Sequence, residues 1–83
     1  MFVYVLTTVR GEDYEGYHIY YQRVFKTLRG AKEELRKRFE KDTKEIEQTW
    51  RESCDGDLED TSYSIACGCE YYEGYIDKKK LGE

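Results

Sequence analysis

Three cysteines and one histidine are the residues of this sequence best suited to chemistry: Cys54, Cys67, Cys69 and His18. They have the residue types of a zinc site, which needs about four ligands in a tetrahedral arrangement. Their spacing does not favour such a site, because the sequence has no CxxC or paired histidine motif and the four residues come from distant segments. We therefore expect neither a metal nor a cofactor, and we interpret the cysteines as small buried hydrophobic residues. A cysteine-based metal-binding regulator stays open as an alternative function.

The cysteines do not predict a disulfide either. Their odd number does not suggest the paired framework of a secreted domain. If a strand continues through Gly68, the thiols of Cys67 and Cys69 point to the same side, about 6–7 Å apart. That separation is too large for an unstrained bond.

Motifs for catalysis and for calcium binding are also missing. The sequence has no Walker A, GxSxG or HExxH motif, and the neighbours of His18 offer neither a nucleophile nor an orienting carboxylate. The acidic run from Asp55 to Asp60 fails as an EF-hand loop, because position six is Asp60 instead of glycine and position twelve is Ala66 instead of glutamate. We predict that the protein is not an enzyme and that the acidic run is a solvated turn. The alternative, that its carboxylates help to meet a basic partner, stays open.

The tyrosines indicate a binding surface. There are nine of them, and the tetrapeptide YEGY occurs twice, at 14–17 and at 72–75. Tyrosine offers a rigid amphipathic contact and is enriched at protein interfaces, so we predict a partner-binding surface in which tyrosines alternate with carboxylates. The alternative, that half or more of the rings fill core and cross-strand positions, stays open. The residues of the predicted surface are Asp13, Tyr14, Glu15, Tyr17, Tyr20, Glu70, Tyr72, Glu73 and Tyr75.

The length and charge of the chain limit the class of protein. Its 83 residues predict a single domain spanning 1–83. No apolar run approaches the roughly 18 residues of a membrane span. The opening sequence MFVYVLTTVRGED lacks the basic region of a signal peptide, so we expect a cytoplasmic protein. The net charge of −4 argues against direct binding of nucleic acid and suits a partner with a basic surface.

The spacing of apolar residues predicts an α+β fold. Residues 2–9 and 17–25 are predicted strands, and the short polar connection 10–16 makes them antiparallel. Thr27 is the expected N-cap of a helix that ends before Gly56, in the turn-forming sequence CDGD. Two more strands are predicted at 61–67 and 70–76. The order is therefore ββαββ, an antiparallel sheet of three to four strands with one long helix packed across it. The apolar stripe of that helix is Leu28, Ala31, Leu35, Phe39, Ile46 and Trp50.

The helix is expected to extend past the sheet. About 24 helical residues span roughly 36 Å, whereas a strand of about eight residues spans about 27 Å. Ile46 and Trp50 would then lie beyond the strands and need cover, which predicts them as the interface of a possible homodimer. The lysines at 78–80 are expected in a solvated C-terminal segment.

A resemblance to small bacteriophage and prophage proteins covers residues 3–35, VYVLTTVRGEDYEGYHIYYQRVFKTLRGAKEEL. Those proteins have a VYVLT-like opening strand, an acidic tyrosine loop, a YHI strand, and a VF-x-T-x-x-x-A-K-E run that enters a helix. The resemblance implies a phage accessory role in the cytoplasm of a host cell. Inhibitors of host defence, including anti-CRISPR proteins, are a prominent class among compact acidic phage proteins. No functional residue carries over from the resemblance.

The expected function is therefore the binding and inhibition of a host defence protein, for example a nucleic-acid-binding effector with a basic surface. The acidic, tyrosine-rich surface would carry the contact. Two further alternatives stay open. One is a sponge for a nucleotide or another small molecule of a signalling defence system, in which the tyrosines stack on the ligand. The other is a regulator or inhibitor of host transcription.

Overall fold

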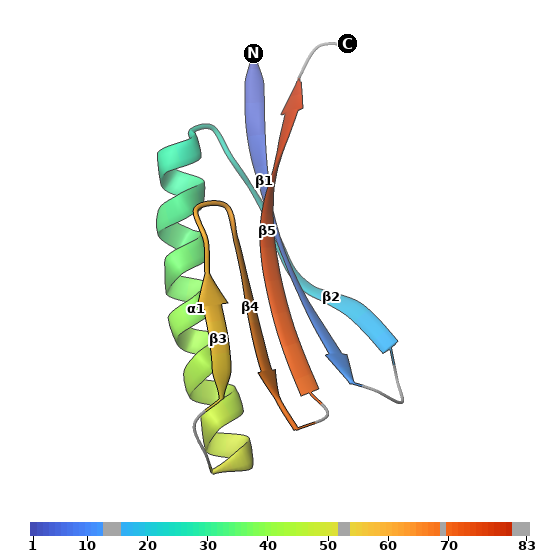
Figure 1. Cartoon of the computed structure of the whole chain (residues 1–83). Coiled ribbons are helices and arrows are strands. Elements are labelled where there is room, and N and C mark those ends of the chain that lie inside the picture. Colours follow the sequence, from blue (N-terminus) through green and yellow to red (C-terminus); the bar gives the residue numbers. More distant parts are fainter. Residues whose placement is uncertain (13–15, 52–53, 69, 81–83) are drawn as a thin grey trace.

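A computed structural model of the chain describes residues 1–12, 16–51, 54–68 and 70–80, which form one helix and one antiparallel sheet in two layers (Figure 1). Within this part of the chain the sheet has five strands in the order β2-β1-β5-β4-β3. The first strand in sequence, β1, is therefore an interior strand, flanked by β2 and β5. In chain order the elements are β1 (Phe2–Glu12), β2 (Gly16–Phe25), α1 (Leu28–Trp50), β3 (Asp55–Leu58), β4 (Ser62–Cys67) and β5 (Glu70–Lys80).

The predicted α+β class is confirmed, but the predicted order ββαββ and the count of three to four strands are wrong in detail. The sequence from Asp55 to Leu58 forms an edge strand, β3, instead of a turn, and it pairs with β4 from Ala66 to Tyr63. All four residues of β3 are exposed. An edge strand of this kind is held by backbone hydrogen bonds to its neighbour and needs no apolar side chains, so its sequence resembles that of a loop.

The last strand is longer than predicted and includes the three lysines at 78–80. Lys80 lies opposite Phe2, and the pairing of β5 with β1 continues without a break to Glu70 opposite Glu12. The lysine side chains are exposed, as expected, but their backbone belongs to the sheet and not to a solvated end segment.

The helix follows the prediction closely. Thr27 is the N-cap: its backbone is extended, and its hydroxyl accepts a hydrogen bond from the backbone N–H of Gly30 at 3.1 Å. Ala31, Leu35 and Ile46 of the predicted stripe are buried against the sheet. From the sheet, Leu6, Ile65 and other core residues pack on Leu35 and Ile46.

The predicted dimer interface at the end of the helix is wrong in one residue. Ile46 is fully buried in the core of the single chain, so it cannot contact another copy. Trp50 is half-buried and packs over Gly68. β1 and β5 are longer than expected, with 11 residues each, although the end of α1 still reaches past the strand ends in Figure 1. At about 3.4 Å per residue such strands are as long as the 23-residue helix at about 1.5 Å per residue.

A β-bulge in β2 turns two consecutive tyrosines toward the helix. Thr8 of β1 lies opposite Tyr21, but Val9 lies opposite Ile19, so Tyr20 is the extra residue. A bulge breaks the strict alternation of side chains along a strand. The hydroxyl of Tyr20 accordingly bonds to the helix, and the ring of Tyr21 lies 3.5 Å from the guanidinium carbon of Arg38.

None of the helical residues in the described ranges forms a segment apolar enough to cross a membrane.

Candidate functional site

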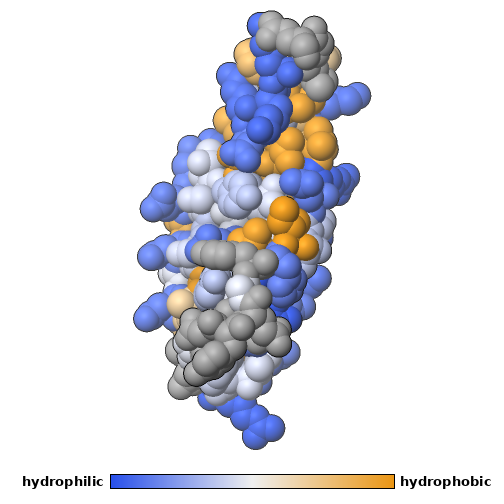
Figure 2. All heavy atoms as spheres, turned by 90° about the vertical axis from the view of Figure 1, so that its right-hand side faces the viewer, coloured by the Kyte–Doolittle hydropathy of each residue, from blue (hydrophilic) through white to orange (hydrophobic). Residues whose placement is uncertain are grey.

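The sheet has one face covered by α1 and one that is uncovered. Side chains directly opposite one another in paired strands share a face, and alternate residues share it along a strand. Leu6 and Thr8 of β1 face the helix, so Val5, Thr7 and Val9 face the other way. Figure 2 views the molecule from the side away from α1 and shows hydrophobic surface in two areas among hydrophilic ones. This uncovered face is the candidate functional site.

One half of the uncovered face, over β1 and β2, is apolar. Val5 lies opposite Val24, and Val9 lies opposite Ile19. Ile19 and Val24, both on the edge strand β2, are each 58% exposed. We call this group the apolar band; it consists of Val3, Val5, Val9, Ile19 and Val24. Val3 and Val9 are only 9% and 8% exposed and Val5 is half-buried, so Ile19 and Val24 form the exposed part of the band.

The other half, over β3, β4 and β5, is hollowed and acidic. The small side chains of Ser62 and Ser64 form the floor of a depression of about 250 Å³, and longer side chains of the neighbouring strands form its rim. We call this depression the acidic hollow; its side chains are Asp57, Glu59, Ser62, Ser64, Glu73 and Tyr75.

The charge of the uncovered face is strongly one-sided. Asp77 lies opposite Val5, and Glu73 lies opposite Val9, so a row of carboxylates on β5 runs beside the apolar band. By register, Asp55 and Asp57 of β3 share this face with Ala66 and Ser64. In the described part of the chain, five carboxylates and one lysine, Lys79, lie on this side of the sheet: the acids are Asp55, Asp57, Glu59, Glu73 and Asp77.

On the covered face, a buried carboxylate ties the helix to two strands. Asp42 of α1 is 1% exposed, and its Oδ2 accepts hydrogen bonds from the hydroxyls of Tyr20 in β2 and Tyr63 in β4, the latter at 2.5 Å. Burial, and then the bond to Asp42, raise the pKa of both phenols far above the ordinary value of 10.0. Both phenols therefore stay protonated and act as donors, which suits hydrogen bonds that stabilise the fold better than it suits a reactive group.

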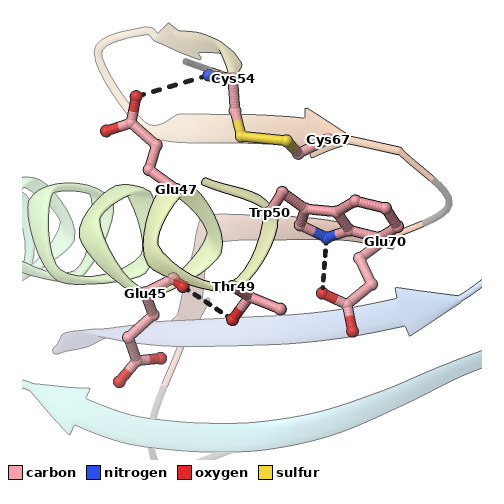
Figure 3. Close-up of a disulfide and its surroundings, with 7 residues drawn as sticks. All are labelled: Glu45, Glu47, Thr49, Trp50, Cys54, Cys67 and Glu70. Carbon is pink, nitrogen blue, oxygen red and sulfur yellow. Dashed lines mark hydrogen bonds between the residues drawn. A yellow bond between two sulfur atoms is a disulfide. The ribbon is translucent and has the colours of Figure 1, made fainter. Parts of the chain in front are cut away.

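A disulfide fastens the far end of the helix to the sheet (Figure 3). It joins Cys54, shortly after α1, to Cys67 at the end of β4, with 5.0 Å between their Cα atoms. The indole N–H of Trp50 donates to Glu70 at 3.1 Å, and Glu70 also pairs with Arg10 at 2.8 Å. The segment after α1 is thus linked to β4 by the disulfide, and the end of α1 is linked to β5 and β1 through Trp50, Glu70 and Arg10.

The disulfide corrects the expectation that the cysteines are unpaired small hydrophobic residues. Cys67 belongs to the alternating set that faces α1, and the end of the helix brings Cys54 back over it. Both sulfurs are occupied by their mutual bond, and no cluster of three or more metal-binding side chains exists among the residues that the structure describes. The Cys3His arrangement is therefore not assembled. Cys69 lies outside the described residues.

The predicted tyrosine surface is divided between the two faces. Glu73 and Tyr75 lie on the uncovered face, in the acidic hollow. Tyr72 is 5% exposed on the covered face, because it alternates with Glu73, and burial raises its pKa although Arg10 opposes the shift. The prediction of Tyr72 as a contact residue is therefore wrong.

Other members of that predicted surface are bound within the protein or lie outside the description. Tyr20 is 38% exposed, but its hydroxyl is bonded to Asp42, and Glu70 is bonded to Trp50 and Arg10. The backbone of Tyr17 lies in β2 opposite Gly11. The side chain of Tyr17, together with Asp13, Tyr14 and Glu15, lies outside the described residues.

The apolar band was missed in the sequence, although a signal for it was present. Residues 2–9 are apolar on both faces, and α1 covers one of them. A strand that is apolar on both faces needs cover on both.

Comparison of the chain with models of protein families, with curated proteins and with solved structures found no match.

Proposed function

We propose that this protein is a non-catalytic binding protein that docks a basic protein surface on the uncovered face of its sheet. The observation that carries the proposal is the apolar band lying directly beside the acidic hollow. Exposed apolar side chains beside a polar rim are typical of protein interaction sites, and in this band Ile19 and Val24 are the exposed ones.

The two halves of the uncovered face contribute to binding in different ways. Ile19 and Val24 lose exposed apolar surface when a partner covers them, and this burial supplies affinity. The carboxylates of the hollow are solvated, so they contribute mainly by attracting a cationic partner and by orienting it. The net charge of −4 acts in the same direction.

The more specific proposal is that the partner is a host defence protein and that binding inhibits it, in the cytoplasm of a phage-infected cell. The support for this step is the resemblance of residues 3–35 to small phage proteins. A nucleic-acid-binding effector fits the proposal, because its nucleic-acid groove is the kind of basic surface that an acidic face complements.

The test compares capture of host proteins by the wild type and by two variants. Ile19→Ser/Val24→Ser removes the two exposed side chains of the apolar band. Leu58→Ser removes an exposed leucine of β3, which the register places on the covered side. Circular dichroism and urea unfolding first establish that both variants are folded. A protein retained by the wild type and by Leu58→Ser, but lost with the double variant, supports the proposal.

The captured protein is then purified and titrated with the wild type. Binding that weakens as salt increases, together with loss of the partner's activity, supports the inhibitor. Equal capture by all three forms, or equal loss with both variants, contradicts docking on this face.

A further inference from the structure

We infer that the segment of the partner that docks on the uncovered face is an amphipathic α-helix with basic residues along one side. This inference rests on the proposed function and adds the form of the ligand. It follows from the dimensions of the apolar band, from the position of the carboxylates beside it, and from the lack of backbone partners on the face of a sheet.

The apolar band has the size of one helix. It covers two adjacent strands, β1 and β2, which lie about 4.8 Å apart, so with its side chains it is about 10 Å wide. A helix with its side chains has a diameter of about 10–12 Å. From Val3 to Val9 the band is about 20 Å long at about 3.4 Å per residue, which corresponds to roughly 13 helical residues at 1.5 Å each.

An extended segment fits this face less well than a helix. The backbone groups of β1 and β5 are paired with their neighbours in the sheet, so a chain lying flat on the face finds no backbone partners there. Unpaired N–H and C=O groups are costly when covered by apolar side chains. A helix satisfies these groups internally, and α1 covers the opposite face of the same sheet in this way.

The position of the acids selects a basic flank on the docking helix. Asp77, Tyr75 and Glu73 alternate along β5 and lie opposite Val5, Thr7 and Val9. They therefore form a row parallel to the band, about 5 Å from β1 and with about 7 Å between successive side chains. Residues four apart on a helix are about 6 Å apart along its axis and lie on one side.

Lysines or arginines at such spacing can meet Glu73 and Asp77 while the apolar side of the helix lies on the band. Tyr75 is 37% exposed and stands between the two acids, where its ring can receive a cation. Three neighbouring side chains of one strand thus match one flank of one helix.

A second copy of this chain is a poorer occupant. Two copies stacked on their apolar bands would cover the valines and the isoleucine, but neither copy would bring cations to the hollow of the other. The uncovered face carries five carboxylates and one lysine in the described residues, so two such faces repel each other.

The experiment uses three synthetic 18-residue peptides and the full-length protein. The first peptide places leucines on one side of a helix and lysines along one flank. The second has the same composition in scrambled order, and the third replaces each lysine by glutamate. Fluorescence anisotropy measures binding, and amide chemical shifts in ¹⁵N-labelled protein locate it.

We expect the first peptide to bind with shifts in β1, β2 and β5, and the other two to bind at least tenfold more weakly. Ile19→Ser/Val24→Ser and Glu73→Gln should each weaken binding of the first peptide at least fivefold. Glu33→Gln, at an exposed position of α1, should change it less than twofold.

Three results would overturn the inference. Equal binding of the scrambled peptide would mean attraction by charge alone. Chemical-shift changes confined to α1 would place the binding site on the helix instead of the uncovered face. A protein that is a dimer, and that dissociates on Ile19→Ser/Val24→Ser, would make a second copy the occupant of the face. A different pair of results is that the first peptide fails to bind while Ile19→Ser/Val24→Ser still abolishes capture of the host protein. That pair of results rejects a docking helix but still supports docking on the uncovered face. If neither depends on these residues, the proposed function fails as well.

Discussion

Replacing Asp42 by alanine should lower the free energy of unfolding by about 3 kcal/mol, because the substitution removes the shared acceptor of two phenols. Hydrogen bonds to charged groups contribute about 1.5–3 kcal/mol each, so the two together give about 3–6 kcal/mol. Removing a carboxyl group that is 1% exposed returns part of its desolvation cost, which brings the expected net effect to the lower end of that range.

The two tyrosines should differ in how much each contributes. Tyr63 is 3% exposed, so Tyr63→Phe leaves Asp42 short of a donor that water cannot replace, and we expect a loss of about 2 kcal/mol. Tyr20 is 38% exposed, and water can reach the place of its hydroxyl. Tyr20→Phe should therefore cost about 1 kcal/mol.

Urea unfolding followed by circular dichroism, with the disulfide intact, measures these differences. In the Asp42→Ala background Tyr63→Phe should cost much less than in the wild type, because the bond it removes is already absent. Asp60→Ala is the matched control: its side chain is 82% exposed and pairs with Lys32 at 2.9 Å, so its loss should stay below about 1 kcal/mol. An Asp42→Ala variant as stable as Asp60→Ala, or equal costs of Tyr63→Phe in both backgrounds, would refute the assigned role of the cluster.

Three further predictions concern the same core. The folded-state pKa of Tyr63 lies above the unfolded value of 10.0, so its contribution to the free energy of unfolding is complete below pH 10. Above pH 10 that contribution falls by up to about 1.4 kcal/mol per pH unit. Urea midpoints between pH 9 and 11.5 should fall less steeply for Tyr63→Phe, and equal slopes would contradict this. Cys54→Ser/Cys67→Ser opens a loop with a sequence separation of 13 and should cost about 3 kcal/mol. A reducing agent should destabilise the wild type similarly and leave the variant unchanged; a stable reduced wild type would argue against the bond. Gly74→Ala places a Cβ 2.2 Å from a ring carbon of Tyr63 and should cost about 1–3 kcal/mol in urea unfolding, whereas Ser64→Ala on the open hollow should cost under about 0.5 kcal/mol.

The elements that depend on local sequence were predictable. The cap at Thr27, the helical spacing of Ala31, Leu35 and Ile46, and the alternation that buries Tyr63 and Ile65 are properties of neighbouring residues. These patterns fixed the α+β class and most strand positions without knowledge of the strand neighbours.

The features that depend on pairing were not predictable in the same way. The bulge at Tyr20 exists only because β2 pairs with β1, and it reverses the face on which this tyrosine lies. The gap in the apolar stripe between Phe39 and Ile46 was visible in the sequence, and Asp42 occupies the core position within it. A polar residue at a core position requires partners, and these were hidden until the strands were placed.

The repeated tetrapeptide shows how one sequence serves two local structures. In the first copy Gly16 begins β2 with a φ of +76°, a left-handed conformation that favours glycine. In the second copy Gly74 lies inside β5, where its missing side chain leaves room for the ring of Tyr63. The two copies are therefore not equivalent halves of a binding surface.

The pairing of β1 with β5 also has a consequence for biosynthesis. Phe2 lies opposite Lys80, so β1 is synthesised well before β5, its hydrogen-bonding partner on that edge. On the ribosome, the β1–β2 hairpin and the helix can form early, but β1 and β5 can pair only after residues 70–80 have emerged. Until then the valines of β1 have no permanent neighbour on that edge, and contacts between the ends of a chain form slowly. A nascent chain stalled before β5 should therefore be more accessible to chaperones and proteases than a chain that includes β5.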